Sequence, residues 1–364
     1  MIRVIHKLLI ISENSDKKRV LKIETKLLAV DKNGDNSQKY SQAVDLLKSG
    51  EVVAFPTETV YGLGAIATND EAVKKIYVAK GRPSDNPLIV HIGTKEELAN
   101  YVEHIPAKAQ ACIDAFWPGP LTLILQAKPN LFAPSVTKLS TVGFRMPDHP
   151  VALEMLQKLH LPVAAPSANR SGKPSPTKAM HVMEDLQGHI AAVVDGGETG
   201  IGLESTVLDV TLEVPTILRP GGVTKEMLES VIGQVNAPKM EEQEAGVAPK
   251  APGMKYTHYA PNAPVYLIEP EIEMIEQSIR KLIENGEQVA LIAPNELQHT
   301  LAKYNFSIGE MNDLQAHSAL LYDALRGCDK TDATVILATT TTYEGVGAAI
   351  MNRLEKAAVG YFIY

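Results

Sequence analysis

The sequence lacks cysteine pairs and long hydrophobic runs, and each absence excludes a class of protein. Its 364 residues include two cysteines, Cys112 and Cys328, which are too far apart to form a disulfide framework or to have the spacing of metal ligands. No stretch reaches the roughly 18 apolar residues that a membrane-spanning helix requires. Near the N-terminus, only Leu8 to Ile11 form an apolar run. We therefore expect a cytoplasmic protein without a membrane segment.

A strongly basic segment is absent as well. The formal net charge is −8 at pH 7, and residues 263–364 carry 7 Lys and Arg against 14 Asp and Glu. Proteins that bind nucleic acid through many phosphates usually have a basic surface. The charge therefore disfavours a general RNA or DNA binder, but it is compatible with a local cationic cleft for a small anion.

The composition is that of a folded chain long enough for two domains. Hydrophobic residues make up 45% of the sequence, which is sufficient for two buried cores. Residues 1–36 resemble an N-terminal extension with one possible edge strand at 22–30. Residues 37–232 alternate short apolar runs with helical periodicity, which is typical of an α/β domain.

The periodicity places individual elements in this first domain. We expect strands at 51–55, 87–92, 121–126, 142–146, 162–165, 191–195, 205–210 and 216–218. Helices are expected at 70–79 and 94–102, and Thr94 with Glu97 would form a capping box for the second. A further helix would be capped by Thr224 and end near Gly233.

A linker and a smaller domain follow. Residues 233–263 are rich in Ala, Pro, Glu and Gln, which is typical of a linker, although their last part contains two tyrosines, a histidine and a lysine. In residues 264–364, strands at 265–268, 288–293 and 334–337 alternate with helices at 272–284, 320–326 and 348–358. This alternation predicts a Rossmann-like parallel sheet.

Common catalytic signatures are missing from the sequence. It has no Gly-x-x-x-x-Gly-Lys-Ser/Thr phosphate loop, no His-Glu-x-x-His and no Gly-x-Ser-x-Gly. The pair Gly345 and Gly347 lacks the third glycine of a dinucleotide fingerprint, and the histidines show no ligand spacing. We therefore expect no metal bound by protein side chains.

Polar loops at predicted strand ends carry the remaining signal. They are Pro56-Thr-Glu-Thr-Val-Tyr-Gly-Leu-Gly64, Lys80-Gly-Arg-Pro-Ser-Asp-Asn86, Ala164-Ala-Pro-Ser-Ala-Asn-Arg-Ser-Gly-Lys-Pro-Ser175, Glu204-Ser-Thr206 and Leu218-Arg-Pro-Gly-Gly222. Each alone is equally compatible with a capped turn. Lys80 and Arg82 suit phosphate oxygens, and Arg145, if buried on its strand, requires an anion. Together the loops favour a large polar cleft for an anionic ligand.

These motifs resemble the threonylcarbamoyl-AMP synthase family, also called YrdC-like. The resemblance rests on the Pro56 to Gly64 motif, Lys80-x-Arg82, Ser167-x-Asn169 and the linker Pro252-Gly-Met-Lys-Tyr-Thr-His-Tyr-Ala-Pro261. It extends from about residue 38 to the end of the chain, and the chain length indicates the two-domain type. The implied fold is α/β, with a twisted open YrdC-like sheet and a smaller Rossmann-like C-terminal domain.

The resemblance implies a nucleotidyltransferase. Such an enzyme makes L-threonylcarbamoyl-AMP and pyrophosphate from L-threonine, bicarbonate or CO2, and ATP, with Mg2+ bound through the ATP phosphates. Other proteins, the tRNA threonylcarbamoyl-transfer machinery, would use the product to make threonylcarbamoyladenosine in tRNA. We expect direct tRNA binding to be weak or absent.

The resemblance also implies roles for individual residues. The catalytic group would be Lys80, Arg82, Ser167 and Asn169. The ATP contacts would be Arg82, Asn86, Thr141, Ser167, Ser175 and Arg219, together with a lid formed by Lys255, Tyr256, His258 and Tyr259. The threonine pocket would contain Thr59, His91, Arg145, Ala165 and Ser205, with Arg145 on the amino acid's carboxylate.

Two alternatives remain open at this stage. A non-catalytic module that binds RNA or a nucleotide could use the same cleft, although the negative charge disfavours it. A related carbamoyl-transfer enzyme could act on another acceptor. The larger hydrogenase-maturation relatives contain zinc fingers, and this chain has no Cys-x-x-Cys.

Overall fold

Ten strands form a mixed sheet in the first domain. The structure is a computed structural model that describes residues 23–31, 33–84, 86–237 and 259–362. The strands are β1 (Lys26–Ala29), β2 (Val53–Phe55), β3 (Gly62–Ile66), β4 (Ile89–His91), β5 (Leu121–Gln126), β6 (Thr141–Arg145), β7 (Val163–Ala164), β8 (Ala192–Asp195), β9 (Thr206–Asp209) and β10 (Thr216–Arg219). Their order is β1-β8-β2-β3-β7-β4-β6-β5-β9-β10, with both parallel and antiparallel pairs.

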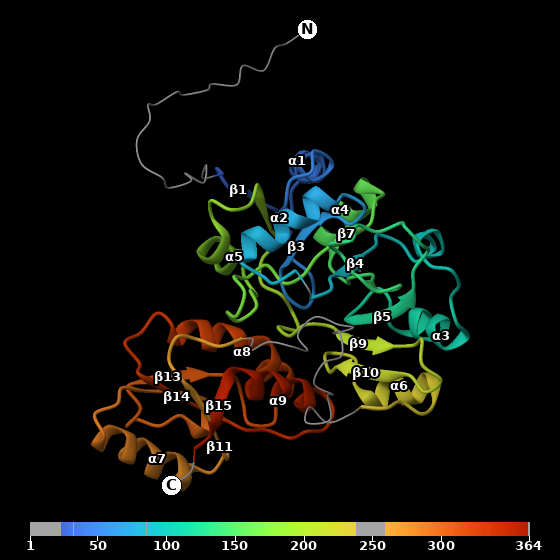
Figure 1. Ribbon diagram of the computed structural model, residues 1–364. Coiled ribbons are helices and arrows are strands. Elements are labelled where there is room, and N and C mark those ends of the chain that lie inside the picture. Colours follow the sequence, from blue (N-terminus) through green and yellow to red (C-terminus); the bar gives the residue numbers. More distant parts are fainter. Residues whose placement is uncertain (1–22, 32, 85, 238–258, 363–364) are drawn as a thin grey trace, which may run out of the picture.

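Helices cover both faces of this sheet (Figure 1). Successive side chains of a strand point to opposite faces, so Val53 and Phe55 of β2 pack under α1 (Ser37–Lys48) and α4 (Pro150–Leu159). Val52 and Ala54 pack on the opposite side. The helices that bury residues in the core on that side are α2 (Asp70–Lys80), α3 (Ala107–Phe116), α5 (Ala179–Leu186) and α6 (Lys225–Ile232).

Five parallel strands form the second sheet. They are β11 (Val265–Ile268), β12 (Val289–Ala293), β13 (Tyr304–Ser307), β14 (Val335–Thr339) and β15 (Ala358–Tyr361), in the order β13-β12-β14-β11-β15. One face packs against α8 (Leu314–Cys328) and α9 (Val346–Ala357), and the other packs against α7 (Ile272–Glu284). The predicted Rossmann-like parallel arrangement is confirmed.

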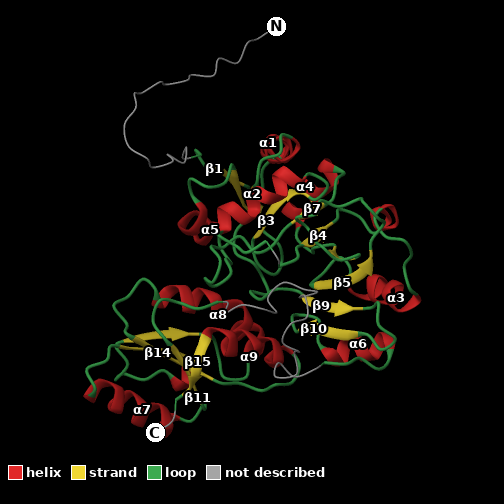
Figure 2. Ribbon diagram, in the orientation of Figure 1, coloured by secondary structure: helices red, strands yellow, loops and turns green. Residues whose placement is uncertain are grey.

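The two domains share an apolar core. Val60 and Leu203 of the first domain belong to the same buried cluster as Leu321 and Tyr322 of α8 and Ile350 of α9. Helices α8 and α9 lie on the side of the C-terminal domain that faces the first domain, whereas α7 lies on the far side (Figure 2). Burial of these side chains fixes the position of one domain on the other.

Several elements differ from their sequence predictions. The predicted helix at 94–102 is a short 3-10 helix, η1 (Glu96–Asn100), and the capping box at Thr94 is wrong, because Lys95 precedes the helix without a side-chain cap. The carboxylate of Glu97 instead accepts the amide of Gly93 at 3.0 Å. The cap by Thr224 is confirmed, since its hydroxyl accepts the amide of Met227. A second 3-10 helix is η3 (Asn295–Leu297).

The edge strand predicted within 22–30 is present as β1, which pairs in parallel with β8. The domain boundaries at 36, 232 and 263 stay predictions. None of the described helices is both long and apolar enough to cross a membrane.

Candidate active site

The polar loops of the first domain meet at one cavity. It lies where β2, β4, β6, β7 and β10 end, beside the C-terminus of α2. Its wall includes, of the residues predicted from the sequence, Thr59, Lys80, Arg82, His91, Arg145, Ala165, Ser167, Asn169, Ser175, Ser205, Arg219 and Tyr259. The sequence assigned no role to three further polar residues of the wall, which are Thr57, Ser171 and Glu204.

The other predicted contacts lie elsewhere. Asn86 is buried but does not line the cavity. Its main-chain carbonyl accepts a long hydrogen bond from the Arg82 side chain at 3.5 Å. Thr141 is the first residue of β6 and is also absent from the wall. The remaining lid residues, Lys255, Tyr256 and His258, lie outside the described part of the chain.

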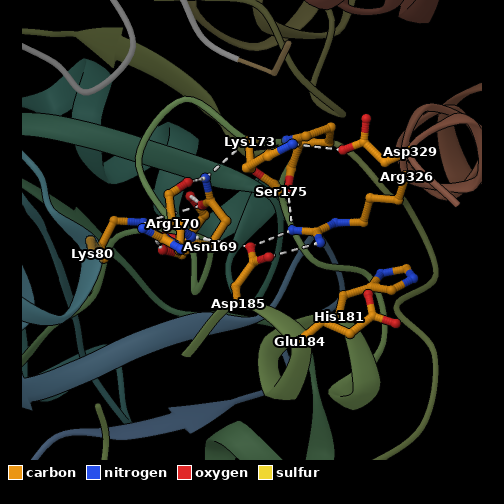
Figure 3. Close-up of polar contacts among 12 residues, drawn as sticks. Lys80, Asn169, Arg170, Lys173, Ser175, His181, Glu184, Asp185, Arg326 and Asp329 are labelled. Carbon is orange, nitrogen blue, oxygen red and sulfur yellow. Dashed lines mark hydrogen bonds and ion pairs between the residues drawn. The ribbon is translucent and has the colours of Figure 1, made fainter. Parts of the chain in front are cut away.

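Lys80 organises the turn that follows β7. Helix α2 ends at this residue because Gly81 adopts a left-handed conformation with φ of 61°. The ammonium group donates to the carbonyls of Ser167 and Asn169 at 2.5 and 2.7 Å (Figure 3). Burial, with the charge of Arg82 in addition, lowers the pKa of Lys80 well below its usual value. Lys80 therefore fixes the loop that begins at Ser167.

Asn169 closes the same turn from the inside. Its Oδ1 accepts from the hydroxyl of Ser167 at 2.6 Å, and its Nδ2 donates to the carbonyls of Arg170 and Lys173 at 2.7 and 2.8 Å. One side chain thus connects both ends of the turn, as Figure 3 shows. Such a residue orders the loop, which agrees with the predicted Ser-x-Asn turn.

Arg145 has the anionic partner that its burial requires. Its Nη2 lies 2.7 Å from the Glu58 carboxylate, and both side chains are largely buried. The Nε donates to the carbonyl of Gly119 at 3.3 Å. Glu58 belongs to the Pro56 to Gly64 motif, but the sequence did not identify it as the partner, because 87 positions separate the two residues in the chain.

His91 is a neutral imidazole beside this ion pair. Burial, together with the positive charge of Arg145, lowers the pKa of His91 to about 3. Its Nδ1 is buried without a hydrogen-bond partner among the described residues. A neutral ring with an unpaired nitrogen on the cavity wall can accept or donate one hydrogen bond to a ligand.

Arg219 and Ser205 are held together on the cavity wall. The Nε of Arg219 donates to the Ser205 carbonyl at 3.1 Å, and one terminal nitrogen donates to the Ser205 hydroxyl at 3.2 Å. That hydroxyl also lies 2.8 Å from the hydroxyl of Thr122 in β5. The two ends of β9 and β10 therefore present a cation and a hydroxyl to the cavity.

Side chains of the C-terminal domain bind the loop from Ser167 to Ser175. From α8, Arg326 donates to the Pro174 carbonyl and pairs with Asp185 of α5 at 2.7 Å (Figure 3). Asp185 also accepts the amide of Arg170. Nearby, Lys173 lies 2.7 Å from Asp329.

Tyr259, in the last part of the predicted linker, lies on the cavity wall. Its φ of 68° is unusual for a bulky residue, and its ring stacks on Tyr322 with centroids 5.2 Å apart. The next amide, of Ala260, donates to the Gly172 carbonyl at 3.0 Å. The end of the linker is thus attached both to the loop after β7 and to the second domain.

Family models match both parts of the chain. One described as telomere recombination matches residues 45–221, and one described as threonylcarbamoyl-AMP synthase, C-terminal domain, matches residues 223–359. The threonylcarbamoyl-AMP synthase of Bacillus subtilis is 52% identical over 336 residues, which cover 92% of this chain and 96% of that protein. A putative threonylcarbamoyl-AMP synthase of Mycobacterium tuberculosis is 40% identical over 191 residues, 52% of this chain and 88% of its own.

A solved structure extends the similarity to the arrangement of both domains. The crystal structure of Pyrococcus abyssi Sua5 complexed with L-threonine matches with a TM-score of 0.87 and 43% identity, and it covers 93% of this chain and 100% of the other. The fold predicted from the sequence is confirmed, and the two alternatives left open by the sequence are set aside. With 52% identity across nearly the whole length of a relative, this chain belongs to the threonylcarbamoyl-AMP synthase family, in the form with a C-terminal domain.

Proposed function

We propose that the protein makes L-threonylcarbamoyl-AMP and pyrophosphate from L-threonine, bicarbonate or CO2, and ATP. The supporting observation is that one cavity contains Arg145 and His91 together with Lys80, Arg82 and Arg219. A small amino acid and a polyphosphate can therefore bind within reach of each other. The relative solved with L-threonine supports the amino-acid side of this proposal.

Threonine binds at the Arg145 side in this proposal. The guanidinium pairs with the carboxylate of the amino acid, and Glu58 keeps it fixed in place at 2.7 Å. The neutral ring of His91 supplies a hydrogen bond that adds no charge. The other members of the pocket are Thr59, Ser205 and the backbone of Ala165.

ATP binds against Arg82 and Arg219 in this proposal. The nucleotide contacts that we propose are Arg82, Asn86, Thr141, Ser167, Ser175, Arg219 and Tyr259, with Lys255, Tyr256 and His258 as further lid residues. Asn86, which is not on the wall, would act through Arg82, to which its carbonyl is bonded. Lys80 and Asn169 act by holding the Ser167 turn in place.

The proposed reaction needs no covalent bond between the protein and a substrate. The unprotonated threonine amine attacks the carbon of CO2; an N–C bond forms as one C–O π bond opens, and the nitrogen loses a proton to water to give the carbamate. A carbamate oxygen then attacks the α-phosphorus of ATP, and the bond to the β-phosphate breaks, so that pyrophosphate leaves with the bonding electron pair. The cavity residues orient both substrates and neutralise charge on the phosphates.

Mg2+ enters with ATP in this proposal. Of the described residues that line the cavity, Glu204 is the only carboxylate, and it already accepts hydrogen bonds from Ser175, Tyr322 and Arg353. The phosphates rather than the protein would therefore supply the metal ligands, and the ion would reduce the phosphate charge. We propose that the adenylate then passes to the tRNA threonylcarbamoyl-transfer machinery, with weak or no direct tRNA binding. A cytoplasmic location stays a prediction.

Pyrophosphate release tests the proposed function. Each substrate is omitted in turn, and we expect release to require threonine, bicarbonate and ATP together. Release that persists without threonine or without bicarbonate would contradict the assignment. Arg82→Ala should reduce turnover strongly while the circular dichroism spectrum stays unchanged, and Lys330→Ala on the exposed surface of the second domain serves as the matched control.

A further inference from the structure

Glu204 is a buried carboxylate of the cavity wall on which both domains converge. It precedes β9 and is 7% exposed. From its own domain it accepts a hydrogen bond from the Ser175 hydroxyl. From the second domain it accepts the Tyr322 hydroxyl and the Nε of Arg353, each at 2.9 Å. Of the three hydrogen bonds that the Glu204 carboxylate accepts from described side chains, two therefore come from helices α8 and α9.

Arg353 connects the two loops of the wall that carry Ser205 and Arg219. It is fully buried, and besides Glu204 it donates to the Pro220 carbonyl at 2.9 Å. It also donates to the Asn352 side chain at 2.8 Å. Because Pro220 follows Arg219 and Glu204 precedes Ser205, one guanidinium from α9 holds both loops in place.

The charge on Glu204 matters for a site that takes phosphates. Burial raises the pKa of Glu204, but the charges of Arg353 and Arg219 outweigh burial and lower it to about 2, so the group is ionised at neutral pH. An anion on the wall would repel a polyphosphate. Arg353, which is not on the wall, places a second positive charge beside Glu204 in addition to that of Arg219.

We propose that Arg353 and Tyr322 are positioning residues for ATP, which neutralise and fix Glu204 so that Ser175 and Arg219 remain correctly placed on the cavity wall. The proposal rests on the proposed function, because it assigns the phosphates to this cavity. It gives the C-terminal domain a defined part in the reaction. That domain sets the electrostatic potential of a site whose substrate it does not touch.

Steady-state kinetics of three full-length variants test this proposal. Arg353→Met leaves Glu204 without its main counter-charge, and we expect the KM for ATP to rise about tenfold or more while the KM for threonine stays within about twofold. The double variant Arg353→Met with Glu204→Gln removes both charges and should bring the ATP KM back to within about threefold of wild type. Arg353→Lys keeps the charge but cannot contact Glu204 and the Pro220 carbonyl together, so we expect an ATP KM between those of wild type and Arg353→Met.

The control is Lys330→Ala, which removes an exposed ion pair between the domains, with Glu184, and should change neither KM. Equal rises in both KM values for Arg353→Met, or no recovery in the double variant, would overturn the proposal. That result would show that Arg353 only supports the fold.

If Arg353→Met does not fold, Tyr322→Phe is measured in its place. This variant keeps the ring that stacks on Tyr259 and removes one donor from Glu204. We expect an ATP KM about threefold higher, and an unchanged value would overturn the proposal. Calorimetric titration of the wild type with ATP distinguishes failure of this inference from failure of the proposed function. No binding would overturn the proposed function as well, whereas normal binding by wild type and Arg353→Met alike would overturn this inference alone.

Discussion

Arg145 is bound from two directions, and its geometry suits no other cation. The Nη2 meets Glu58 and the Nε meets the Gly119 carbonyl. A lysine has one nitrogen and cannot make both contacts while pairing with a carboxylate. We expect Arg145→Lys to raise the KM for threonine about tenfold or more, with the ATP KM unchanged, in the pyrophosphate assay. An equal rise in the KM for threonine and the KM for ATP would show that Arg145 does not bind threonine in particular.

The buried imidazole of His91 makes the free energy of unfolding depend on pH in the acidic range. Its pKa is about 3 in the folded protein, owing first to burial and then to Arg145, against about 6.5 when unfolded. Between these values the unfolded chain binds a proton that the folded chain does not. Stability therefore rises with pH across this window and is lost as pH falls, by up to about 1.4 kcal/mol per pH unit.

His91→Gln should remove this dependence. We expect its urea midpoint to fall less steeply than that of wild type from about pH 6 to about pH 4. The exposed His104 gives the matched control, since His104→Gln should leave the slope unchanged. An identical slope for wild type and His91→Gln would show that the ring is protonated in the folded state.

Individual site residues were predictable where a motif carried them, and their partners were not. Ser167 and Asn169 lie in a polar loop that follows a strand, and Lys80 ends a helix just before another polar loop; such features are visible in a sequence. Glu204 lies in a similar loop, but its partners Tyr322 and Arg353 are 118 and 149 positions away. Contacts at such separations depend on how two domains pack, which no local pattern encodes.

The loop from Ser167 to Ser175 is the element on which the site depends most. Asn169 accepts from Ser167 and Lys80 and donates to two carbonyls of the same loop. Asn169→Ala removes all four contacts, and we expect kcat/KM to fall about a hundredfold or more. Thermal unfolding should change little, because the Asn169 side chain itself belongs to no apolar cluster. Met180→Ala, at an exposed position on α5, is the control; near-normal turnover of Asn169→Ala would show that the turn is not needed.

Among the elements, most strands were predicted, but the sequence analysis placed no helix at α1, α3, α4 or α5 and no strand at β3, β13 or β15. Strand β3 was missed because its Gly62 and Gly64 are typical of a turn. At Gly64 the absent side chain is a packing requirement, since a Cβ would lie 2.8 Å from Phe55 and Val163. Helix α8 was predicted only in part, although Asp313 caps its start by accepting the Ala316 amide.

At the scale of the whole molecule, Leu203 ties the unfolding of the two domains together. It is fully buried in the apolar cluster formed mainly by the second domain. We expect Leu203→Ala to cost about 2–5 kcal/mol and to split the calorimetric unfolding transition in two, because the domains lose shared burial. Leu212→Ala, at a site 43% exposed in the first domain, should shift nothing. A single unsplit transition in Leu203→Ala would mean that Val60 and the polar contacts between the domains are sufficient to keep them coupled.

The anchoring of Glu204 by Arg353 has a consequence for shorter members of the family. A protein reduced to the first domain has no helix α9, so an acidic side chain at this place would have no counter-ion from outside. Such proteins would have Arg219 as the remaining positive charge beside it, or would carry a neutral residue there. On this inference, loss of the second domain would require a compensating substitution within the first domain.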